Sequence, residues 1–326
     1  MLARLPSLCI GVIGDLFLDR YLDIDGILTE PSLETGLDAF QVTRVRSCPG
    51  AAGTVVNNLV AFGVGQVVPI SVIGNDGEGY ELLQGLDSLG ISRDRLHLRR
   101  DFRTPTYTKP MLSEPGKAAR ELNRLDIKNR SPLPSTAEQA VLENLAETWP
   151  RLDALIVSDQ VSEAECGVIT SRVRDRLAEM GQERPATVIL ADSRERIGLF
   201  RSVWLKPNQK ECRDAVGAAD VADGARKLAA RAGRPVFCTR GADGIHIVDP
   251  RQKPMSETVV PAVAVAGPID PVGAGDSVNA GLACALAAGA SLAEAAAFAN
   301  LVASITIRQL GTTGVATPAQ LREACC

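Results

Sequence analysis

The chain is organised around one stretch near its C-terminal end, Gly267-Pro268-Ile269-Asp270-Pro271-Val272-Gly273-Ala274-Gly275-Asp276-Ser277. A proline-free segment of mostly small residues, 278–290, follows it and predicts a helix. The N–H groups of Gly273, Ala274 and Gly275 would then point at an anion from the helix N-terminus, where the dipole also favours negative charge. Asp276 has two interpretations that the stretch alone leaves open. It is either a helix cap or a base that takes a proton from a hydroxyl attacking a phosphoryl group.

Composition limits the class of protein. The 326 residues are 45% hydrophobic and 23% charged, with a net charge of -4 and no Lys/Arg block, which argues against a nucleic-acid surface. Eight cysteines are scattered without a C-x-x-C pair and indicate buried thiols in a reducing compartment. The first apolar run is too short for a membrane span and lacks a signal cleavage pattern. We therefore expect a cytoplasmic protein with neither a nucleic acid nor a membrane as partner.

Short apolar runs alternate with helix-like segments along the chain. Strands are predicted at 8–13, 66–73, 154–158, 186–191, 203–205 and 236–239, with a hairpin around Gly244. Helices are predicted at 55–62, 80–89, 137–148, 164–180, 209–216, 221–232, 276–288 and 291–309. This rhythm predicts an α/β fold with a parallel sheet covered on both faces. Alternating polar and apolar residues at 22–48 and 104–127 interrupt the rhythm and predict a small lid sheet.

Acids and a glycine-rich turn lie beside the first strand. Asp15 follows that strand directly, at the end where open α/β sheets bind ligands. Asp19 comes four residues later, with a solvated loop as the competing interpretation. The small-residue turn from 48 to 54 opens a helix that faces the same side. Lys109 and Arg124 belong to the alternating stretches, where substrate contact and solvated lid charge both remain open.

Three further clusters have paired interpretations. Asn208 and Glu211 occupy the cap and third positions of a predicted helix, so they form either a capping box or a site for hydrated Mg²⁺. The segment Thr239-Arg-Gly-Ala-Asp-Gly244 is either a plain hairpin turn or a backbone shelf for a nucleotide. Asp270 either coordinates a cation or caps its loop.

The order of these clusters resembles that of the ribokinase-like (PfkB-type) carbohydrate kinases along nearly the whole chain. The segment 270–277 is similar to that family's Asp-Thr-x-Gly-Ala-Gly-Asp signature, Asn208-x-x-Glu211 to its Asn-x-x-Glu element, and 239–244 to its Thr-x-Gly-x-x-Gly segment. The resemblance implies a ribokinase-like three-layer α/β/α sandwich with a mostly parallel central sheet and a small β-sheet lid.

Within that family, the chain resembles the kinase half of the bacterial heptose-phosphate kinases of lipopolysaccharide-precursor synthesis. Gly14-Asp15-Leu-Phe-Leu-Asp19-Arg-Tyr21 is similar to their Gly-Asp-x-x-Leu-Asp-Arg-Tyr, and Arg120-Glu-Leu-Asn-Arg124-Leu-Asp126 to their lid run. We therefore expect one kinase domain over residues 1–326, with a lid sheet from about 17–48 and 100–128. We expect no nucleotidyltransferase domain.

The resemblance also implies roles for individual residues. Asp276 is the implied base and Gly273, Ala274 and Gly275 the implied anion hole, while Asp270 lies where the family binds a monovalent cation, with potassium as the candidate ion. Asp15 corresponds to the ligand of the sugar hydroxyls. The other implied substrate contacts are Asp19, Gly50, Ala51, Thr54, Lys109 and Arg124. The implied contacts to ATP are Asn208 and Glu211, which also hold Mg²⁺ through water, together with Thr239, Gly241, Gly244 and Asn300.

The turn at 50–54 departs from the family's Gly-Gly-Ala-x-Asn. Ala51 stands for the second glycine and adds a methyl group where the backbone approaches the sugar. Thr54 stands for the asparagine and changes a hydrogen-bonding side chain. Pro271 replaces a threonine in the cation loop and removes one N–H donor.

These features predict an ATP-dependent kinase that phosphorylates a hydroxyl of a sugar or sugar phosphate, with a heptose-phosphate-like substrate favoured. A homodimer paired through its lid sheets is expected, because exposed strand edges need covering. One alternative is a nucleoside kinase of the same fold, which the low aromatic content of 4% disfavours. Another is a catalytically weakened sugar-sensing or scaffold protein, which the altered 50–54 turn favours and the retained Asp276, Asn208 and Glu211 disfavour.

Overall fold

The computed structural model describes residues 1–311 and 313–324. Nine strands form the main sheet in the order β16-β15-β14-β13-β12-β11-β1-β6-β7. The strands from β7 to β14 run parallel, and β15 and β16 add an antiparallel edge. The strands of this sheet are β1 Cys9–Gly14, β6 Gln66–Gly74, β7 Leu96–Arg99, β11 Ala154–Asp159, β12 Val188–Ser193, β13 Trp204–Leu205, β14 Val236–Thr239, β15 Ile245–Asp249 and β16 Ser256–Val260.

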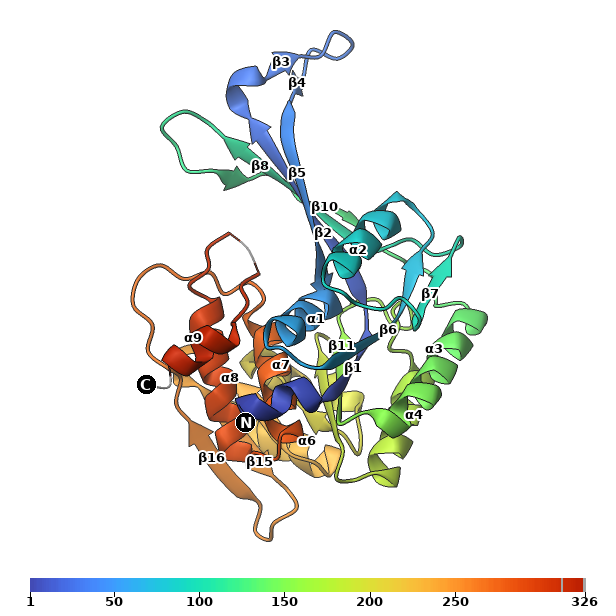
Figure 1. Cartoon of the computed structure of the whole chain (residues 1–326), viewed down its shortest axis with the longest axis vertical. Coiled ribbons are helices and arrows are strands. Elements are labelled where there is room, and N and C mark those ends of the chain that lie inside the picture. Colours follow the sequence, from blue (N-terminus) through green and yellow to red (C-terminus); the bar gives the residue numbers. More distant parts are fainter. Residues whose placement is uncertain (312, 325–326) are drawn as a thin grey trace.

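Helices cover both faces of the sheet, as Figure 1 shows. They are α1 Ala52–Ala61, α2 Gly77–Ser88, α3 Ser135–Thr148, α4 Ser171–Glu183, α5 Gln209–Asp214, α6 Val221–Ala232, α7 Ala274–Ala287, α8 Leu292–Thr306 and α9 Pro318–Glu323. Successive strand residues point to opposite faces, so β11 separates two apolar cores. Ile156 belongs to the core that contains α1, α2, α7 and α8, whereas Leu155 and Val157 belong to the core that contains α3, α4 and α6. The predicted three-layer α/β/α architecture is confirmed.

A second sheet forms the lid, in the order β10-β8-β2-β5 with β9 attached to β8. Its strands are β2 Leu16–Asp25, β5 Val42–Ala51, β8 Thr106–Ser113, β9 Arg120–Glu121 and β10 Leu125–Ile127. A two-stranded extension, β3 Glu30–Pro31 and β4 Asp38–Ala39, forms the far tip of the lid, and Figure 1 shows the lid projecting from the body. Because β2 follows β1 after the single residue Asp15, the lid is joined directly to the centre of the main sheet.

Several predicted helices begin at other residues than expected, and two of them show the reason. The helix predicted at 164–180 begins at Ser171, because Thr170 caps it by accepting a hydrogen bond from the Val173 N–H at 3.2 Å. The residues before it form an irregular loop that wraps Asp15. The helix predicted at 55–62 begins at Ala52, because β5 continues to Ala51 and the chain turns there. The hairpin predicted at Gly244 is confirmed as the antiparallel pair β14–β15.

None of the helices formed by 1–311 and 313–324 combines the length and the apolar character that a bilayer crossing requires.

Candidate active site

Three buried polar side chains meet where β12, β13 and α7 converge. Asp192 near the end of β12 accepts a hydrogen bond from Asn279 Nδ2 at 2.6 Å, and the Lys206 ammonium lies 3.1 Å from the same carboxylate oxygen. Lys206 is only 3% exposed. The Asp192 and Glu211 carboxylates raise the pKa of Lys206, against a burial that acts to lower it. Lys206 therefore stays charged beneath the site.

Asp276 lies in the first turn of α7, after Gly273. Gly273 adopts φ +78°, a left-handed conformation that glycine reaches without a Cβ penalty, and this lets the chain turn sharply into the helix. Burial and the Asp192 charge raise the pKa of Asp276 to about 7, although Lys206 and Arg194 act against this rise. A carboxylate that titrates near neutrality is well matched to general-base work.

The turn before α7 presents fewer free donors than the sequence predicts. The Ala274 N–H donates to the Pro271 carbonyl at 3.1 Å, because residues 271–274 close a tight turn. The Ala274 N–H is therefore engaged within the turn, and its place in the anion hole stays a prediction. The Lys206 ammonium lies beneath the turn, 3.7 Å from the position that a Cβ on Gly275 would take. Lys206 thus supplies positive charge at the place where the anion hole was expected.

Asn208 and Glu211 form a complete capping box at the start of α5. The Glu211 N–H donates to Asn208 Oδ1 at 2.9 Å, and the Asn208 N–H donates to Glu211 Oε2 at 2.7 Å. Burial and the Asp192 charge raise the pKa of Glu211, so the two carboxylates lie near one another. The capping-box interpretation of this motif is confirmed. Glu211 Oε1 takes no part in the box.

The donor set near Asp192 fits Mg²⁺, which prefers oxygen ligands and is usually held by one or two carboxylates together with phosphates and water. Asp192 and Glu211 supply those carboxylates at the carboxyl end of the sheet. Over the described ranges, no three His, Cys, Asp or Glu side chains come close enough to enclose a metal ion by themselves. This arrangement fits an ion that is shared with substrate phosphates.

The segment after β14 lies beside α5, and the Thr239 N–H donates to the Pro207 carbonyl at 2.9 Å. Gly241 has open space on its Cα side, as a shelf for a flat ligand requires. Gly244 closes the turn, and the Arg240 N–H donates to its carbonyl at 2.8 Å. The Asn300 amide is used internally, because its Nδ2 donates to the carbonyls of Val260 and Pro261 at 3.2 and 2.9 Å. Asn300 therefore holds α8 to the end of β16.

Asp270 links two loops. Its carboxylate accepts hydrogen bonds from the N–H groups of Val272 and Gly311, both at 3.0 Å. Its own N–H donates to the Ile307 carbonyl at 2.7 Å. The carboxylate thus fastens the segment before α7 to the segment after α8.

Asp15 is enclosed by the loop that follows β11, the strand that pairs with β1. The backbone N–H groups of Gln160, Val161 and Val168 donate to its carboxylate at 2.9, 3.2 and 2.7 Å. Burial and the nearby Asp159 charge raise the pKa of Asp15 to about 6, against the effect of these amides. Both carboxylate oxygens are engaged, so Asp15 primarily anchors the 160–168 loop.

Asp19, also a predicted substrate contact, lies on β2 four residues after Asp15. It is 7% exposed, and its Oδ1 lies 3.4 Å from the Lys109 ammonium. A Cβ on Gly50 would come within 2.6 Å of Asp19 Oδ2, so this close approach requires glycine at position 50. The Asp19 charge contributes to the raised pKa of Asp276. The Asp19 charge is thus felt at Asp276, and burial and Asp192 are the larger causes of the raised pKa.

Other predicted substrate contacts lie on the lid or the turn beneath it. Lys109 also donates to the Tyr21 hydroxyl at 3.1 Å. Arg124 makes two hydrogen bonds to Asp126, at 2.6 and 2.8 Å, and stacks 4.0 Å from the centre of the Tyr107 ring. Thr54 is buried in the first turn of α1, and its side-chain methyl carbon would lie 3.4 Å from a Cβ on Gly273. Thr54 thus packs beneath the turn that precedes Asp276.

Ala51 adopts an unusual backbone conformation, with φ +52° and ψ -118° at the N-terminus of α1. Side chains with a Cβ rarely adopt such angles, and the strain costs about 1–3 kcal/mol. This is the position at which the family pattern has glycine. The alanine is therefore accommodated at a cost in stability, while the turn keeps the geometry that a glycine would give it.

We predict that Ala51→Gly stabilises the protein by about 1 kcal/mol, because the relieved strain exceeds the entropy that a glycine loses on folding. The melting temperature should rise by about 2 °C in calorimetry. Ala52→Gly is the matched control, because Ala52 is the first residue of α1 and gains nothing from a glycine. Equal losses of stability in the two variants would contradict the strain at Ala51.

The sequence interpretation overlooked several residues of the site: Asp192, Arg194, Lys206 and Asn279. The signal that could have identified the first three is their position at or just after the carboxyl end of a parallel strand. Asn279 lies inside a helix that is buried almost throughout, and no local pattern distinguishes it from its neighbours.

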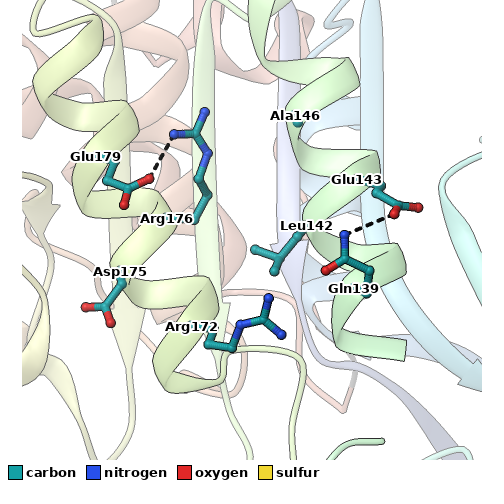
Figure 2. Close-up of a pocket in the computed structure, with 8 residues that line it drawn as sticks. All are labelled: Gln139, Leu142, Glu143, Ala146, Arg172, Asp175, Arg176 and Glu179. Atoms are coloured by element: carbon teal, nitrogen blue, oxygen red, sulfur yellow. Dashed lines mark hydrogen bonds and ion pairs between the residues drawn. The ribbon is translucent and has the colours of Figure 1, made fainter. Parts of the chain in front are cut away.

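A roomy groove of about 470 Å³ lies elsewhere, between α3 and α4 (Figure 2). Its arginines are already paired, since Arg172 lies 2.6 Å from Glu138, and Arg176 lies 3.0 Å from Glu179 and 2.7 Å from Glu183. None of the candidate site residues lines it. We therefore place the chemistry at the sheet edge and not in this groove.

Comparison with known proteins identifies related chains. The family model described as "pfkB family carbohydrate kinase" matches residues 12–320. The bifunctional protein HldE of Trichlorobacter lovleyi is 33% identical over 329 residues, which covers 98% of this chain and 63% of that protein. HldE of Caulobacter vibrioides is 31% identical, with 98% of this chain and 65% of that protein covered. The chain thus spans less than two thirds of the length of these curated relatives.

Solved structures show the same fold. Ribokinase from Thermotoga maritima superposes with a TM-score of 0.70 at 19% identity and covers 98% of this chain and 99% of that one. Arabidopsis thaliana ribokinase, complexed with ribose and ATP, has a TM-score of 0.70 at 15% identity, with coverages of 97% and 98%. Phosphofructokinase-2 from Escherichia coli, in complex with potassium, has a TM-score of 0.70 at 18% identity, with coverages of 97% and 98%.

Proposed function

Because the chain belongs to the pfkB family of carbohydrate kinases, we propose that it transfers the γ-phosphoryl group of ATP to a hydroxyl of a sugar or sugar phosphate, with Asp276 as the base. One observation carries the proposal. The Asp276 carboxylate has its pKa raised to about 7, and the buried Lys206 ammonium lies beneath the neighbouring Gly275. This pairing of a proton acceptor with a positive charge supports a base and a phosphate site at the start of α7.

At the acceptor end, Asp19 would accept hydrogen bonds from sugar hydroxyls, and Lys109 would donate to a neighbouring oxygen. Because Gly50 has no side chain, the backbone there lies close to Asp19, and we expect the sugar to bind against this carboxylate. The Asp15 carboxylate holds the 160–168 loop in place beside this site. Closure of the lid would exclude water, which otherwise competes with the acceptor hydroxyl.

At the phosphate end, the Lys206 ammonium and the N–H groups of the turn before α7 would bind the transferring phosphoryl group. Positioning and electrostatic stabilisation supply most of the rate in such transfers. Asp192 and Glu211 are the residues that would hold Mg²⁺, which neutralises phosphate charge when bound. Asp276 takes the proton of the acceptor hydroxyl as its oxygen attacks the γ-phosphorus.

A heptose phosphate is the favoured acceptor, because it fits the relation to HldE. Lys109 and Arg124 lie on this lid together with the Tyr21 and Tyr107 rings. A nucleoside acceptor is the second candidate, since such a ring could support a base. A sugar sensor without turnover is the third, because Ala51 strains the turn beside the acceptor site.

A coupled ATPase assay separates these candidates when it is run against heptose, hexose and pentose phosphates, free sugars and nucleosides. We expect turnover with a sugar phosphate and none with nucleosides. Preferred turnover of a nucleoside would support the second candidate. Sugar binding by calorimetry without turnover of any substrate would support the sensor.

The pH dependence of activity follows from Asp276. Its carboxyl group must be ionised to accept a proton, so we expect kcat/KM to fall about tenfold per pH unit below a limb near pH 7 and to level off above it. Asp19→Asn removes a charge that raises the pKa of Asp276, so the limb should move to lower pH in that variant. An activity that stays constant between pH 5 and 8 would contradict Asp276 as the base.

We also propose that a second copy of the chain covers the lid. Leu33 is fully exposed at the lid tip, and Leu37 and Val45 are also exposed on the lid. β5 and β10 are the free outer strands of the sheet. We expect a dimer by light scattering at micromolar concentration and a folded monomer after Leu33→Asp with Leu37→Asp. A monomeric wild-type protein would contradict this pairing.

A further inference from the structure

Arg194 lies at the carboxyl edge of the main sheet, directly after β12 and two residues after Asp192. Its backbone N–H donates to the Asp159 carbonyl at 3.1 Å, which keeps the chain close to the end of β11. Its side chain is exposed, unlike that of the neighbouring Asp192. The guanidinium group can therefore reach a ligand at this edge.

The charge of Arg194 has no carboxylate partner within the described part of the chain. Its Nη2 donates to the neutral amide oxygen of Gln160 at 3.1 Å. The other cations at this edge are compensated, since Arg196 lies 2.8 Å from Asp159 and Lys206 lies 3.1 Å from Asp192. Arg194 therefore offers an uncompensated guanidinium group beside the phosphate end of the site.

The field of Arg194 reaches both sides of that site. Its charge acts to lower the pKa of Asp276 on α7 and the pKa of Glu211 on α5, where burial acts in the opposite direction. Arg194 also lies at the same sheet edge as Asp192, two residues further along the chain, and Asp192 contacts α7 through Asn279. The transferring phosphoryl group of the proposed reaction would bind at this edge.

We propose that Arg194 donates hydrogen bonds to the transferring phosphoryl group, and that Gln160 positions its guanidinium group for this contact. The inference rests on the proposed kinase function. During transfer, the acceptor oxygen forms a bond to the γ-phosphorus, and the bond from that phosphorus to the bridging oxygen breaks. ADP leaves with the electron pair, and the hydroxyl proton passes to Asp276. Arg194 forms no covalent bond and stabilises charge on the equatorial oxygens.

Gln160 is well placed for this positioning task. Its backbone N–H donates to the buried Asp15 carboxylate at 2.9 Å, which fixes the start of its side chain. Its side-chain oxygen then accepts the hydrogen bond from Arg194. Asp15, Gln160 and Arg194 thus form a chain of contacts from the centre of the sheet to the phosphate site.

Arg194→Gln tests the contact, with Arg201→Gln as the matched control. Arg201 is an exposed arginine that pairs with Asp175 at 3.0 Å and does not contact the site. We expect kcat to fall about 10²-fold in Arg194→Gln, the typical loss of one transition-state donor. The Kd for ADP should change little. The Kd for ADP with aluminium fluoride, which mimics the planar phosphoryl group, should rise by about the same factor by which kcat falls. Arg201→Gln should behave as wild type in all three measurements.

A kcat within about threefold of wild type would overturn the inference, as would equal weakening of ADP and of ADP with aluminium fluoride. Added guanidinium salt should restore part of the activity that Arg194→Ala loses, and it should not raise the activity of Arg201→Ala. Phosphoryl transfer by the wild type with full activity in Arg194→Gln would sink this inference alone. Absence of transfer by the wild type would sink the proposed function first.

Two substitutions at Gln160 test the positioning. Gln160→Ala should lower kcat about tenfold, because the guanidinium group loses its hydrogen-bond partner. Gln160→Glu should lower kcat further, because a carboxylate would pair with Arg194 and divert it from the phosphoryl group. Neither substitution should lower kcat further in the Arg194→Gln background, since no guanidinium group is left to position. Full additivity of the two losses would contradict the positioning of Arg194 by Gln160.

Discussion

Asp276→Asn should lower kcat by at least about a hundredfold while leaving the affinity for ATP nearly unchanged. The amide keeps the shape of the side chain and the first turn of α7, and it loses the ability to accept the hydroxyl proton. The substitution removes one negative charge from the cluster that also contains Asp192, Glu211 and Lys206. Because that charge would repel the phosphates, its loss should not weaken nucleotide binding. Steady-state kinetics and calorimetry with ATP measure the two effects separately.

Asp214→Asn is the control for Asp276→Asn. Asp214 is an exposed carboxylate at the end of α5, paired with Lys210 at 2.6 Å, and its loss should leave kcat unchanged. The pH limb near 7 should disappear in Asp276→Asn, because the group that titrates there is gone. A variant that retained comparable activity would show that another group takes the proton.

Lys206→Met should destabilise the protein by about 3–5 kcal/mol, because it leaves the buried Asp192 carboxylate without its cation. Asn279 alone then has to satisfy that carboxylate. Activity should also fall by about a hundredfold or more, because the ammonium group beneath Gly275 no longer faces the phosphoryl group. Urea denaturation measures the first effect, and the coupled kinase assay at a permissive temperature measures the second.

The double substitution Lys206→Met with Asp192→Asn separates stability from catalysis. Without the unpaired charge, most of the lost stability should return, whereas activity should remain low because both the cation and a carboxylate proposed to hold Mg²⁺ are absent. Lys210→Met is the control, since that exposed lysine pairs only with Asp214 and should contribute less than about 1 kcal/mol. A Lys206→Met protein as stable as wild type would show that the Asp192 charge is compensated in another way.

The layers and the turn before α7 were accessible from the sequence because their signals are local. Apolar runs in regular alternation with helical segments predict a parallel sheet, and β11 separates two cores as that rhythm requires. The segment 273–276 also predicts its own structure, because its glycines allow a tight turn directly before a helix. Neither inference needs knowledge of a distant contact.

The two acids after β1 illustrate what the sequence does not contain. Asp15 and Asp19 look alike locally, and the resemblance assigned the sugar to Asp15. The distinction depends on the 160–168 loop, which reaches Asp15 from about 145 residues further along the chain. It also depends on β5, which brings Gly50 against Asp19. Pairing across such distances is set by the fold and not by neighbouring residues.

A sequence motif also does not show whether a hydrogen-bond donor is already engaged. Ala274 lies in a signature that predicts a free N–H, yet the turn closes that N–H onto Pro271. Asn300 lies where the resemblance puts an adenine contact, yet its amide binds the carbonyls that end β16. A motif names the residue, and only the surrounding backbone shows whether its donor is already occupied.

The position of Lys109 on β8 has a consequence for how the protein folds. Its ammonium group meets the Tyr21 hydroxyl of β2 across 88 residues of chain, through a parallel pairing of the two strands. Closing a loop of that length costs roughly 4 kcal/mol of chain entropy, which non-local pairing must overcome before it stabilises anything. The intervening β6 pairs with β1, and β7 pairs with β6, so this loop is shorter once these strands have docked. We therefore infer that the acceptor face of the lid is a late product of folding, assembled on a body that has already formed.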